Sequence, residues 1–131
     1  MKSFYVKATD STPEIKFDLG ENIFYIKGKS VFSEVDIFYD PVIDWLKNLE
    51  GNLDHPIVFH FDLEYFNIVS SKRILFVLYT LNELRNNGAD IQVSWSFSVE
   101  DDDMKEVGED YACMVNLPFN FICKSLEHEV D

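Results

Sequence analysis

Residues 91–98, IQVSWSFS, alternate between apolar and polar side chains over their whole length. Because successive side chains of a β-strand point to opposite faces of its sheet, this alternation predicts a strand with one dry face and one wet face. The dry face would carry Ile91, Val93, Trp95 and Phe97, and the wet face Gln92, Ser94, Ser96 and Ser98. A sheet that leaves one face in water has only its other face to offer to helices. The chain is therefore expected to pack all its helices on one side of a sheet.

Other segments also have the pattern of strands. EIKFDL and IFYIKG flank the short segment GEN, in which Gly20 and Asn22 suit a turn, so a β-hairpin is expected there. An edge strand at FYVKA is expected to precede it. PIVFHFDLEYF alternates again, with Ile57, Phe59, Phe61 and Leu63 on one face. A last strand is expected around PFNFICKSL, near the end of the chain.

Three segments are predicted to be helices. FYDPVIDWLKNLEGN offers Asp40 as the N-cap, Pro41 as the first helical residue and Gly51 just past the end. The segment from Ser71 to about Asn87 has an apolar stripe at helical spacing and ends at the glycine of NNG. A third helix is expected after VEDDD. Its inward side chains would be Met104, Val107 and Tyr111.

The predicted order of elements is β β α β α β α β. This order favours an α/β protein, or α+β if the hairpin dominates, with an open mixed sheet of four or five strands and about three helices on one face. No repeat, linker or change of composition divides the 131 residues, so one domain spanning 1–131 is expected. The charged tail at 126–131 is expected to be frayed.

The charge of the chain limits its partners. Asp and Glu number 24 against 11 Lys and Arg, giving a formal net charge of −13. A surface of that sign is repelled by nucleic-acid backbones and by anionic membranes, so a protein with a basic patch or a small molecule is the expected partner. No run approaches the roughly 20 apolar residues of a membrane span, and MKSFYVKATD has no signal-peptide core, so the cytoplasm is the expected location.

Metal and redox chemistry have little support in the sequence. Cys113 and Cys123 lie in apolar surroundings without a CxxC pair, so buried free thiols are expected. The acidic run EDDDMKEVGED lacks the D-x-D-x-D-G spacing of a calcium loop. We expect this run to be a solvated segment that favours the positive end of the following helix, with a docking role as an addition. No metal or cofactor is expected.

Catalysis is the rival hypothesis from another functional class. A small enzyme or ligand-binding domain would use a pocket near His60, Asp62 and Ser71. However, no G-x-S-x-G elbow, S-x-x-K spacing or phosphate-binding glycine loop is present. His60 between two phenylalanines is more typical of an ordinary strand histidine. We therefore expect a protein that is not an enzyme.

Ser70 and Ser71 stand directly before the apolar helical run, and two interpretations remain open. Either hydroxyl can accept a hydrogen bond from a free backbone N–H at the helix start, which makes it an N-cap. A phosphate at the same place is stabilised by the same N–H groups and by the helix dipole. Periodicity does not distinguish a cap from a phosphorylation switch.

Four segments together resemble one family. KGKSVFSEVDIFYDPVIDWL, YFNIVSSKRIL, VSWSFSVEDDDMKEVGEDY and LPFNFI occur in the order and at about the spacing of the SiaC-type regulatory phosphoproteins. The most specific elements are the aromatic and proline run at Phe38–Leu46, the segment Asn67–Lys72 and the acidic run Asp101–Asp110.

The resemblance implies a non-enzymatic regulator with a STAS-like fold, related in plan to anti-sigma-factor antagonists. In that family a protein kinase phosphorylates a hydroxyl in an Asn-Thr-Ser-Ser-like segment, and a metal-dependent protein phosphatase removes the phosphate. The unphosphorylated form activates a diguanylate cyclase in the best-known system. The partner-binding residues implied here are Asn67, Ile68, Lys72, Asp101, Asp102, Asp103 and Glu106.

One position departs from the family pattern. The threonine that follows the asparagine falls on Ile68, which has no hydroxyl, and the next serine falls on Val69. Ser70 and Ser71 remain as candidate phosphoacceptors in a shifted register. The chain is therefore either a regulator with a displaced switch or an adaptor that binds its partner constitutively.

Overall fold

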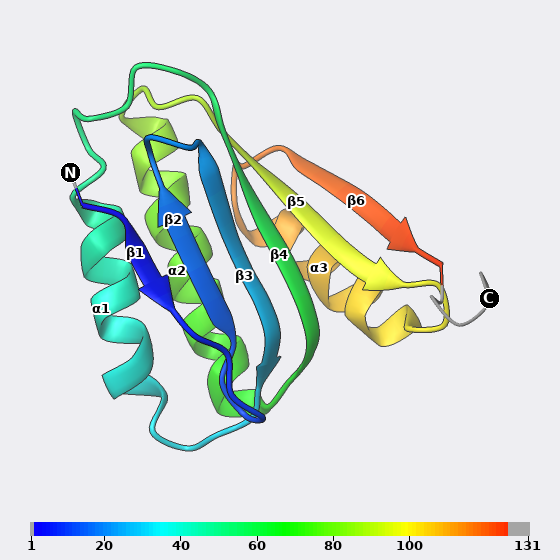
Figure 1. Cartoon of the computed structure of the whole chain (residues 1–131). Helices are drawn as coiled ribbons and strands as arrows, with labels where there is room; N and C mark the ends of the chain where they lie inside the picture. The colour runs from blue at the N-terminus through cyan, green and yellow to red at the C-terminus, as the bar shows by residue number, and fades with distance from the viewer. Residues whose placement is uncertain (1, 126–131) are drawn as a thin grey trace.

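The computed structural model describes residues 2–125, and the tail predicted to fray lies outside them. The strands are β1 (Phe4–Val6), β2 (Glu14–Asp18), β3 (Ile23–Ser30), β4 (Ile57–Phe66), β5 (Ile91–Ser98) and β6 (Phe119–Lys124). The helices are α1 (Val35–Lys47), α2 (Ile68–Asn86) and α3 (Asp102–Met114). The described part of the chain thus has six strands rather than the four or five expected, because the edge strand β1 joins the five strands of the predicted order in one sheet (Figure 1).

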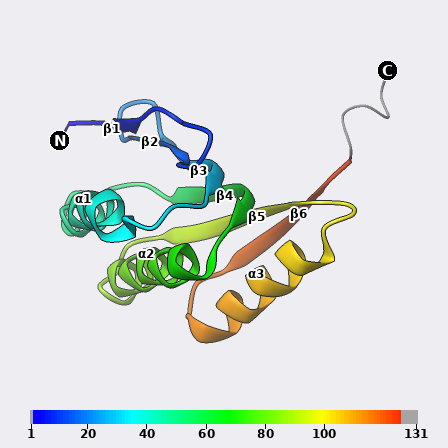
Figure 2. The ribbon, with the colours of Figure 1, turned by 90° about the horizontal axis from the view of Figure 1, so that it is seen from below.

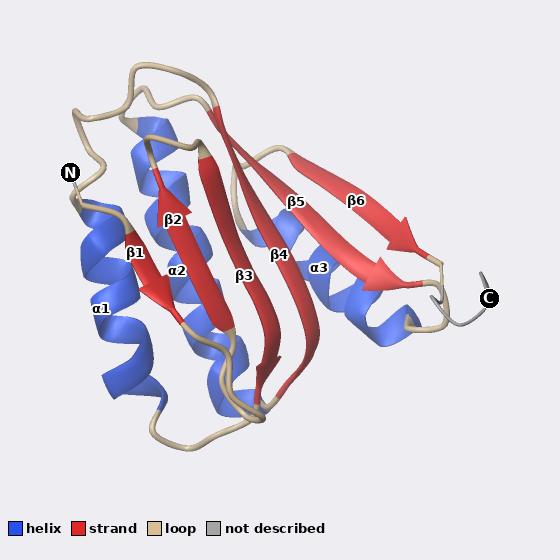
Figure 3. Cartoon of the chain, viewed as in Figure 1, coloured by secondary structure: helices blue, strands red, loops and turns tan. Residues whose placement is uncertain are grey.

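All six strands form one sheet in the order β1-β2-β3-β4-β5-β6. The first three strands pair antiparallel, and β3 to β6 pair parallel. The three helices lie on one face of this sheet (Figures 2 and 3). The α/β architecture predicted from the alternation of residues 91–98 is therefore confirmed.

The core lies between the sheet and the helices. It contains the predicted apolar set of β4, Ile57, Phe59, Phe61 and Leu63, and the predicted stripe of α2, Ile74, Val77, Leu78, Leu81 and Leu84. Trp95 of β5 is 1% exposed, and its indole N–H donates to the carbonyl of Met104 in α3 at 3.0 Å. Gly108, one turn further along α3, lies directly on the Trp95 ring, since a Cβ there would stand 2.5 Å from two ring atoms. The absence of a side chain lets α3 approach the sheet this closely.

Helix α1 begins earlier than predicted. Its N-cap is Glu34, so Asp40 and Pro41 lie inside the helix and do not start it. The buried residues Val35 and Tyr39 extend the apolar stripe into the first turn, and this burial stabilises helix ahead of the proline. Pro41 and Ile37 are both exposed, so the helical hydrogen bond that proline removes lies on the outer side of α1 rather than on its core face.

The two cysteines are free, as expected, but the expectation that they are buried is wrong. Both are exposed. Cys113 lies near the end of α3, a helix that buries only Met104, Gly108 and Tyr111. Cys123 lies on β6, which pairs with β5 and is the outermost strand of the sheet formed by residues 2–125.

No helix within residues 2–125 is long and apolar enough to cross a membrane.

Candidate functional site

The parallel strands β3, β4 and β5 each lead into a helix, so the N-termini of α1, α2 and α3 follow the carboxyl ends of neighbouring strands (Figure 1). In open α/β sheets this edge is the usual place for binding sites. Helix α2 starts directly after the central strand β4. The residues singled out in the sequence, Asn67–Lys72 and Asp101–Glu106, belong to two of these helix starts.

Asn67 is the N-cap of α2, so of the two interpretations left open for Ser70 and Ser71, the one that makes either serine the cap is wrong. The Asn67 side-chain oxygen accepts from the backbone N–H of Ser70 at 2.9 Å, and its amide group donates to the carbonyl of Phe32 at 3.0 Å. The Asn67 backbone N–H donates to the carbonyl of Ser30 at 3.1 Å. One residue therefore caps α2 and ties it to the end of β3.

Ser70 lies inside the protein. It is 0% exposed, and its hydroxyl accepts a hydrogen bond of 2.8 Å from the hydroxyl of Ser30. Ser30 in turn lies 2.7 Å from the hydroxyl of Tyr39. Since the single proton of Ser30 goes to Ser70, Tyr39 is the donor to Ser30. This chain of three buried hydroxyls joins α1, β3 and α2.

Burial raises the pKa of Tyr39 to about 12, although its bond to Ser30 acts in the opposite direction. The pKa of Tyr111 is also raised to about 12 by burial, and its hydroxyl donates to the carbonyl of Ser71 at 2.8 Å. Both tyrosines are therefore protonated at neutral pH. In that form Tyr39 of α1 supports the first turn of α2 through Ser30, and Tyr111 of α3 bonds it directly.

The raised pKa values predict a loss of stability at alkaline pH. The unfolded chain releases these tyrosine protons near pH 10, whereas the folded protein keeps them to about pH 12, so the free energy of unfolding falls as pH rises from 10 to 12. Each tyrosine contributes up to about 1.4 kcal/mol per pH unit in that interval. Urea unfolding at pH 9 to 12 should show a smaller slope for Tyr39→Phe. An unchanged slope in this variant would contradict the assignment.

Ser71 is half-buried, and its hydroxyl donates to the carbonyl of Ile68 at 2.7 Å. Of the two predicted phosphoacceptors, only Ser71 thus has access to solvent. Lys72 is exposed, and its ammonium lies 6.0 Å from the centre of the Phe76 ring.

The exposed apolar residues at the start of α2 form a surface that we call the α2 patch, consisting of Tyr65, Ile68 and Val69. Ile68 is 88% exposed, and Tyr65 is 61% exposed. A shallow hollow of about 410 Å³ is lined by these residues together with Phe66 and Asn67. Exposed apolar side chains gathered at one place are typical of a protein-binding surface.

The start of α3 adjoins the α2 patch. A second hollow, of about 220 Å³, is lined by Tyr65, Phe66, Asp101, Asp103, Met104 and Val107. The side chain of Asp101 caps α3 by accepting from the backbone N–H of Met104 at 3.0 Å. Asp102, Asp103 and Glu106 are exposed. The structure therefore brings the two predicted partner-binding segments together, with an acidic rim beside an apolar surface.

Sequence reasoning missed three residues of this site. Tyr65 belongs to the surface itself, while Ser30 and Tyr39 hold Ser70 from behind. The exposed tyrosine follows Glu64, where the strict alternation of β4 ends, and that break was the available signal. No local pattern indicates the hydroxyl chain, since Ser30 and Ser70 are 40 residues apart.

The residues of the catalytic hypothesis do not come together. His60 is exposed and alternates with the buried Phe59 and Phe61, so it points to the open face of the sheet. Asp62, on the same face, is paired with Lys124. Ser71 belongs to α2, on the opposite face.

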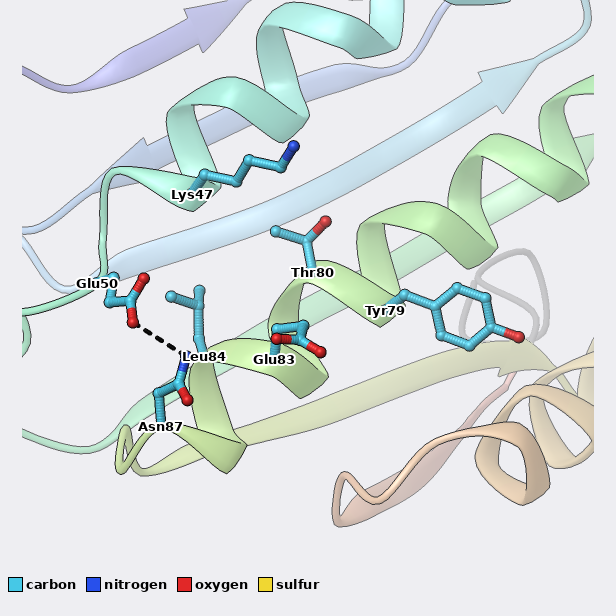
Figure 4. A pocket seen from close by; sticks show the side chains of 7 residues that line it. All are labelled: Lys47, Glu50, Tyr79, Thr80, Glu83, Leu84 and Asn87. Carbon is cyan, nitrogen blue, oxygen red and sulfur yellow. Dashed lines mark hydrogen bonds between the residues drawn. The ribbon is translucent and has the colours of Figure 1, made fainter.

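A further hollow, of about 270 Å³, lies at the other end of α2 (Figure 4). It is lined by Lys47, Glu50, Tyr79, Thr80, Glu83, Leu84 and Asn87. The side-chain amide of Asn87 donates to the carboxylate of Glu50 at 3.0 Å. This bond joins the residue that follows α2 to the turn that follows α1. None of the site residues predicted from the sequence lines this hollow, and none of the α2 patch residues does.

Comparison with known proteins identifies relatives over nearly the whole chain. The sequence model described as SiaC family regulatory phosphoprotein matches residues 6–124. An uncharacterized protein of Pseudomonas aeruginosa strain UCBPP-PA14 is 24% identical over 119 residues, which cover 91% of this chain and 94% of that protein.

Two solved structures have the same fold. Apo-SiaC from Pseudomonas aeruginosa superposes with a TM-score of 0.83 at 23% identity, covering 93% of this chain and 99% of that one. SiaC in complex with the diguanylate cyclase SiaD, of which it is the activator, gives a TM-score of 0.85 at 22% identity, covering 92% and 99%.

Proposed function

Because this chain belongs to the SiaC family of regulatory phosphoproteins, we propose that it is a cytoplasmic, non-enzymatic regulator that binds a diguanylate-cyclase-type effector through the α2 patch. A solved SiaC is the activator of the cyclase bound to it, which supports an effector of that type. The observation that carries the proposal is the 88% exposure of Ile68 on the first turn of α2. An aliphatic side chain exposed to this extent gains most by burial in a partner.

The surroundings of the α2 patch favour a partner with basic residues. Asp101 and Asp103 line the hollow on the α3 side of the patch, and the whole chain carries a net charge of −13. Complementary charge raises the rate of association and selects among partners. The effector surface is therefore expected to combine an apolar centre with a basic border.

We further propose that binding is constitutive. The family threonine position is occupied by Ile68, and Ser70 is sealed behind Ser30 and Tyr39. A kinase has no access to a hydroxyl that is 0% exposed in the folded protein.

Phosphorylation at Ser71 is the second candidate, since Ser71 is half-buried and lies in the first turn of α2. A kinase and a metal-dependent phosphatase would then be further partners, and Lys72 would help to neutralise the phosphate. Mass spectrometry of the protein purified from its native cell separates the two candidates. An unmodified chain that co-purifies with its effector supports constitutive binding, whereas a phosphate on Ser71 that is removed by phosphatase contradicts it.

Ile68→Glu tests the α2 patch itself. Placing a carboxylate at the centre of an apolar contact is expected to weaken binding of the co-purified cyclase by about 30-fold, the effect of losing a hot-spot residue. Calorimetric titration measures the change. Met114→Glu is the matched control, because Met114 is an exposed apolar residue at the far end of α3. Equal affinities of wild type and Ile68→Glu, or equal losses in both variants, would refute the α2 patch as the binding surface.

A further inference from the structure

A second apolar groove lies between α1 and the edge strand β1. It has a volume of about 400 Å³ and is lined by Phe4, Val6, Phe32, Glu34, Ile37, Phe38 and Pro41. None of these residues lines either hollow at the α2 patch. Figure 2 shows α1 beneath the edge of the sheet that is formed by β1. The groove therefore runs along the side of the molecule, between this edge strand and the helix below it.

Ile37 lines this groove and is 76% exposed. Phe32 and Phe38 form its floor, with ring centres 5.3 Å apart in an edge-to-face arrangement. The rigid floor and the projecting isoleucine together provide an anchor point and a pocket beside it, which is the usual arrangement of a helix-binding groove.

Pro41 adds a free acceptor to the same surface. Proline has no N–H, so the carbonyl of Ile37, four residues earlier in α1, lacks its intrahelical donor. A carbonyl that lacks its helical donor, on the apolar anchor Ile37, suits a donor supplied from outside, such as a lysine or arginine side chain.

The charges around the groove are unequal on its two sides. The α1 side carries Glu34 and Asp44, both exposed, and also Asp36 and Asp40, which both pair with Arg73 of α2. The β1 side carries Lys2 and Lys7. Carboxylates thus predominate along α1, the helix against which an occupant would lie.

We infer that this groove is a second docking surface, and that its occupant is an amphipathic helix of a partner protein, apolar toward Ile37 and basic toward α1. A second copy of this chain is disfavoured, because it would bring acidic α1 surfaces together in a molecule of net charge −13. The surface is independent of the α2 patch, so the protein can hold two partner segments at once.

The probe is a 14-residue peptide of leucine and lysine with leucines at the i, i+3, i+4 and i+7 spacing of one helix face, added to the full-length chain. Amide shifts in NMR spectra are expected to concentrate on β1 and the first two turns of α1. Ile37→Ser is expected to raise the Kd at least fivefold, whereas Met114→Ser, the same kind of change on an exposed helical residue elsewhere, leaves it unchanged.

Two control peptides separate shape from charge. A scrambled peptide of the same composition is expected to bind at least fivefold more weakly, and a leucine–glutamate peptide is expected not to bind. Glu34→Gln with Asp44→Asn is expected to reduce the salt dependence of binding. The Glu34 side chain makes no capping bond, so this change spares the helix start.

Three results would overturn the proposal. The first is that the NMR amide shifts caused by the peptide centre on α3 or on the α2 patch. The second is that Ile37→Ser binds the peptide with the Kd of the unmodified chain. The third is a dimer of the free chain that Ile37→Ser dissociates, because the groove would then be an interface between two copies. Sedimentation of the unmodified chain and of Ile37→Ser measures this last outcome.

Discussion

Ser70→Asp is expected to lower the free energy of unfolding by roughly 3–5 kcal/mol, the usual cost of an uncompensated charge in a protein interior. Ser70 is 0% exposed and is enclosed by Ser30 and Tyr39, which are also 0% exposed. The larger carboxylate has to be desolvated and also exceeds the space of a hydroxyl. Chemical denaturation at pH 7 measures the loss.

The pH dependence of this variant distinguishes charge from size. Burial raises the pKa of the introduced carboxyl above its value of about 4 in the unfolded chain, so the destabilisation by charge fades as pH falls from the raised pKa to about 4 and is absent below that. The stability difference from wild type should therefore shrink in acid. A difference that is the same at pH 7 and pH 3.5 would indicate overpacking alone.

Ser71→Asp is the matched control. Ser71 is half-buried in the first turn of α2, where a negative charge is favoured by the helix dipole, so its stability is expected to stay within about 1 kcal/mol of wild type. Wild-type stability of Ser70→Asp would contradict the buried hydroxyl chain. A phosphomimetic substitution at Ser70 thus changes folding stability, and only the one at Ser71 can test whether a negative charge at this helix start changes effector binding.

Gly108→Ala is expected to destabilise the protein by about 2–3 kcal/mol. Alanine normally stabilises a helix relative to glycine by about 1 kcal/mol, so the sign itself is informative. Here the new Cβ would stand 2.5 Å from Trp95, whose ring is buried and held by its bond to Met104. Either α3 or the ring has to move.

Thermal denaturation checks this prediction, with a fall in Tm of about 6–12 °C expected for a chain of this length. Gly20→Ala is the control, because its Cβ would meet only Asp18 at 3.4 Å. Combining Gly108→Ala with Trp95→Phe frees space, so the double variant should lose less than the sum of the single losses. A Gly108→Ala protein as stable as wild type would contradict the close approach of α3 to β5.

The strands and the α2 stripe could be predicted because each buried face has a simple period. The burial of β4 alternates strictly as far as Glu64, and the stripe from Ile74 to Leu84 leaves one helical face apolar. In β5 the expected dry face is right for Ile91, Val93 and Trp95, but Ser94, expected on the wet face, is only 3% exposed, because it lies between His60 of β4 and Asn120 of β6. Burial of one face fixes register and orientation together, so these patterns identify both the element and its inward side.

The first residues of the helices were harder to predict from the sequence, because polar residues near a helix start can serve as caps or have other roles. The serine pair had the composition of a cap, yet α2 begins three residues earlier at Ile68, which is exposed and β-branched and so is typical of a strand end. In α1, Pro41 suggested a first turn, whereas the buried Val35 and Tyr39 stabilise helix ahead of it. Tertiary burial outweighed local preference in α1, whereas the hydrogen bond from the Ser70 N–H to the Asn67 side chain sets the start of α2.

The candidate site was predicted as two separate segments, Asn67–Lys72 and Asp101–Glu106. Their adjacency follows from the pairing of β4 with β5, which a linear pattern does not contain. The burial of Ser70 could not be predicted from the sequence either, because the two residues that bond and cover its hydroxyl, Ser30 and Tyr39, come from distant segments of the chain.

Each strand of the sheet lies beside the strand that precedes it in the chain. A ribosome delivers the strands in this same order, N-terminal first. Every new strand can therefore join the free edge left by the one before, and none has to insert between two that are already paired. The sheet can grow by addition at one edge during synthesis, with β6 closing the row.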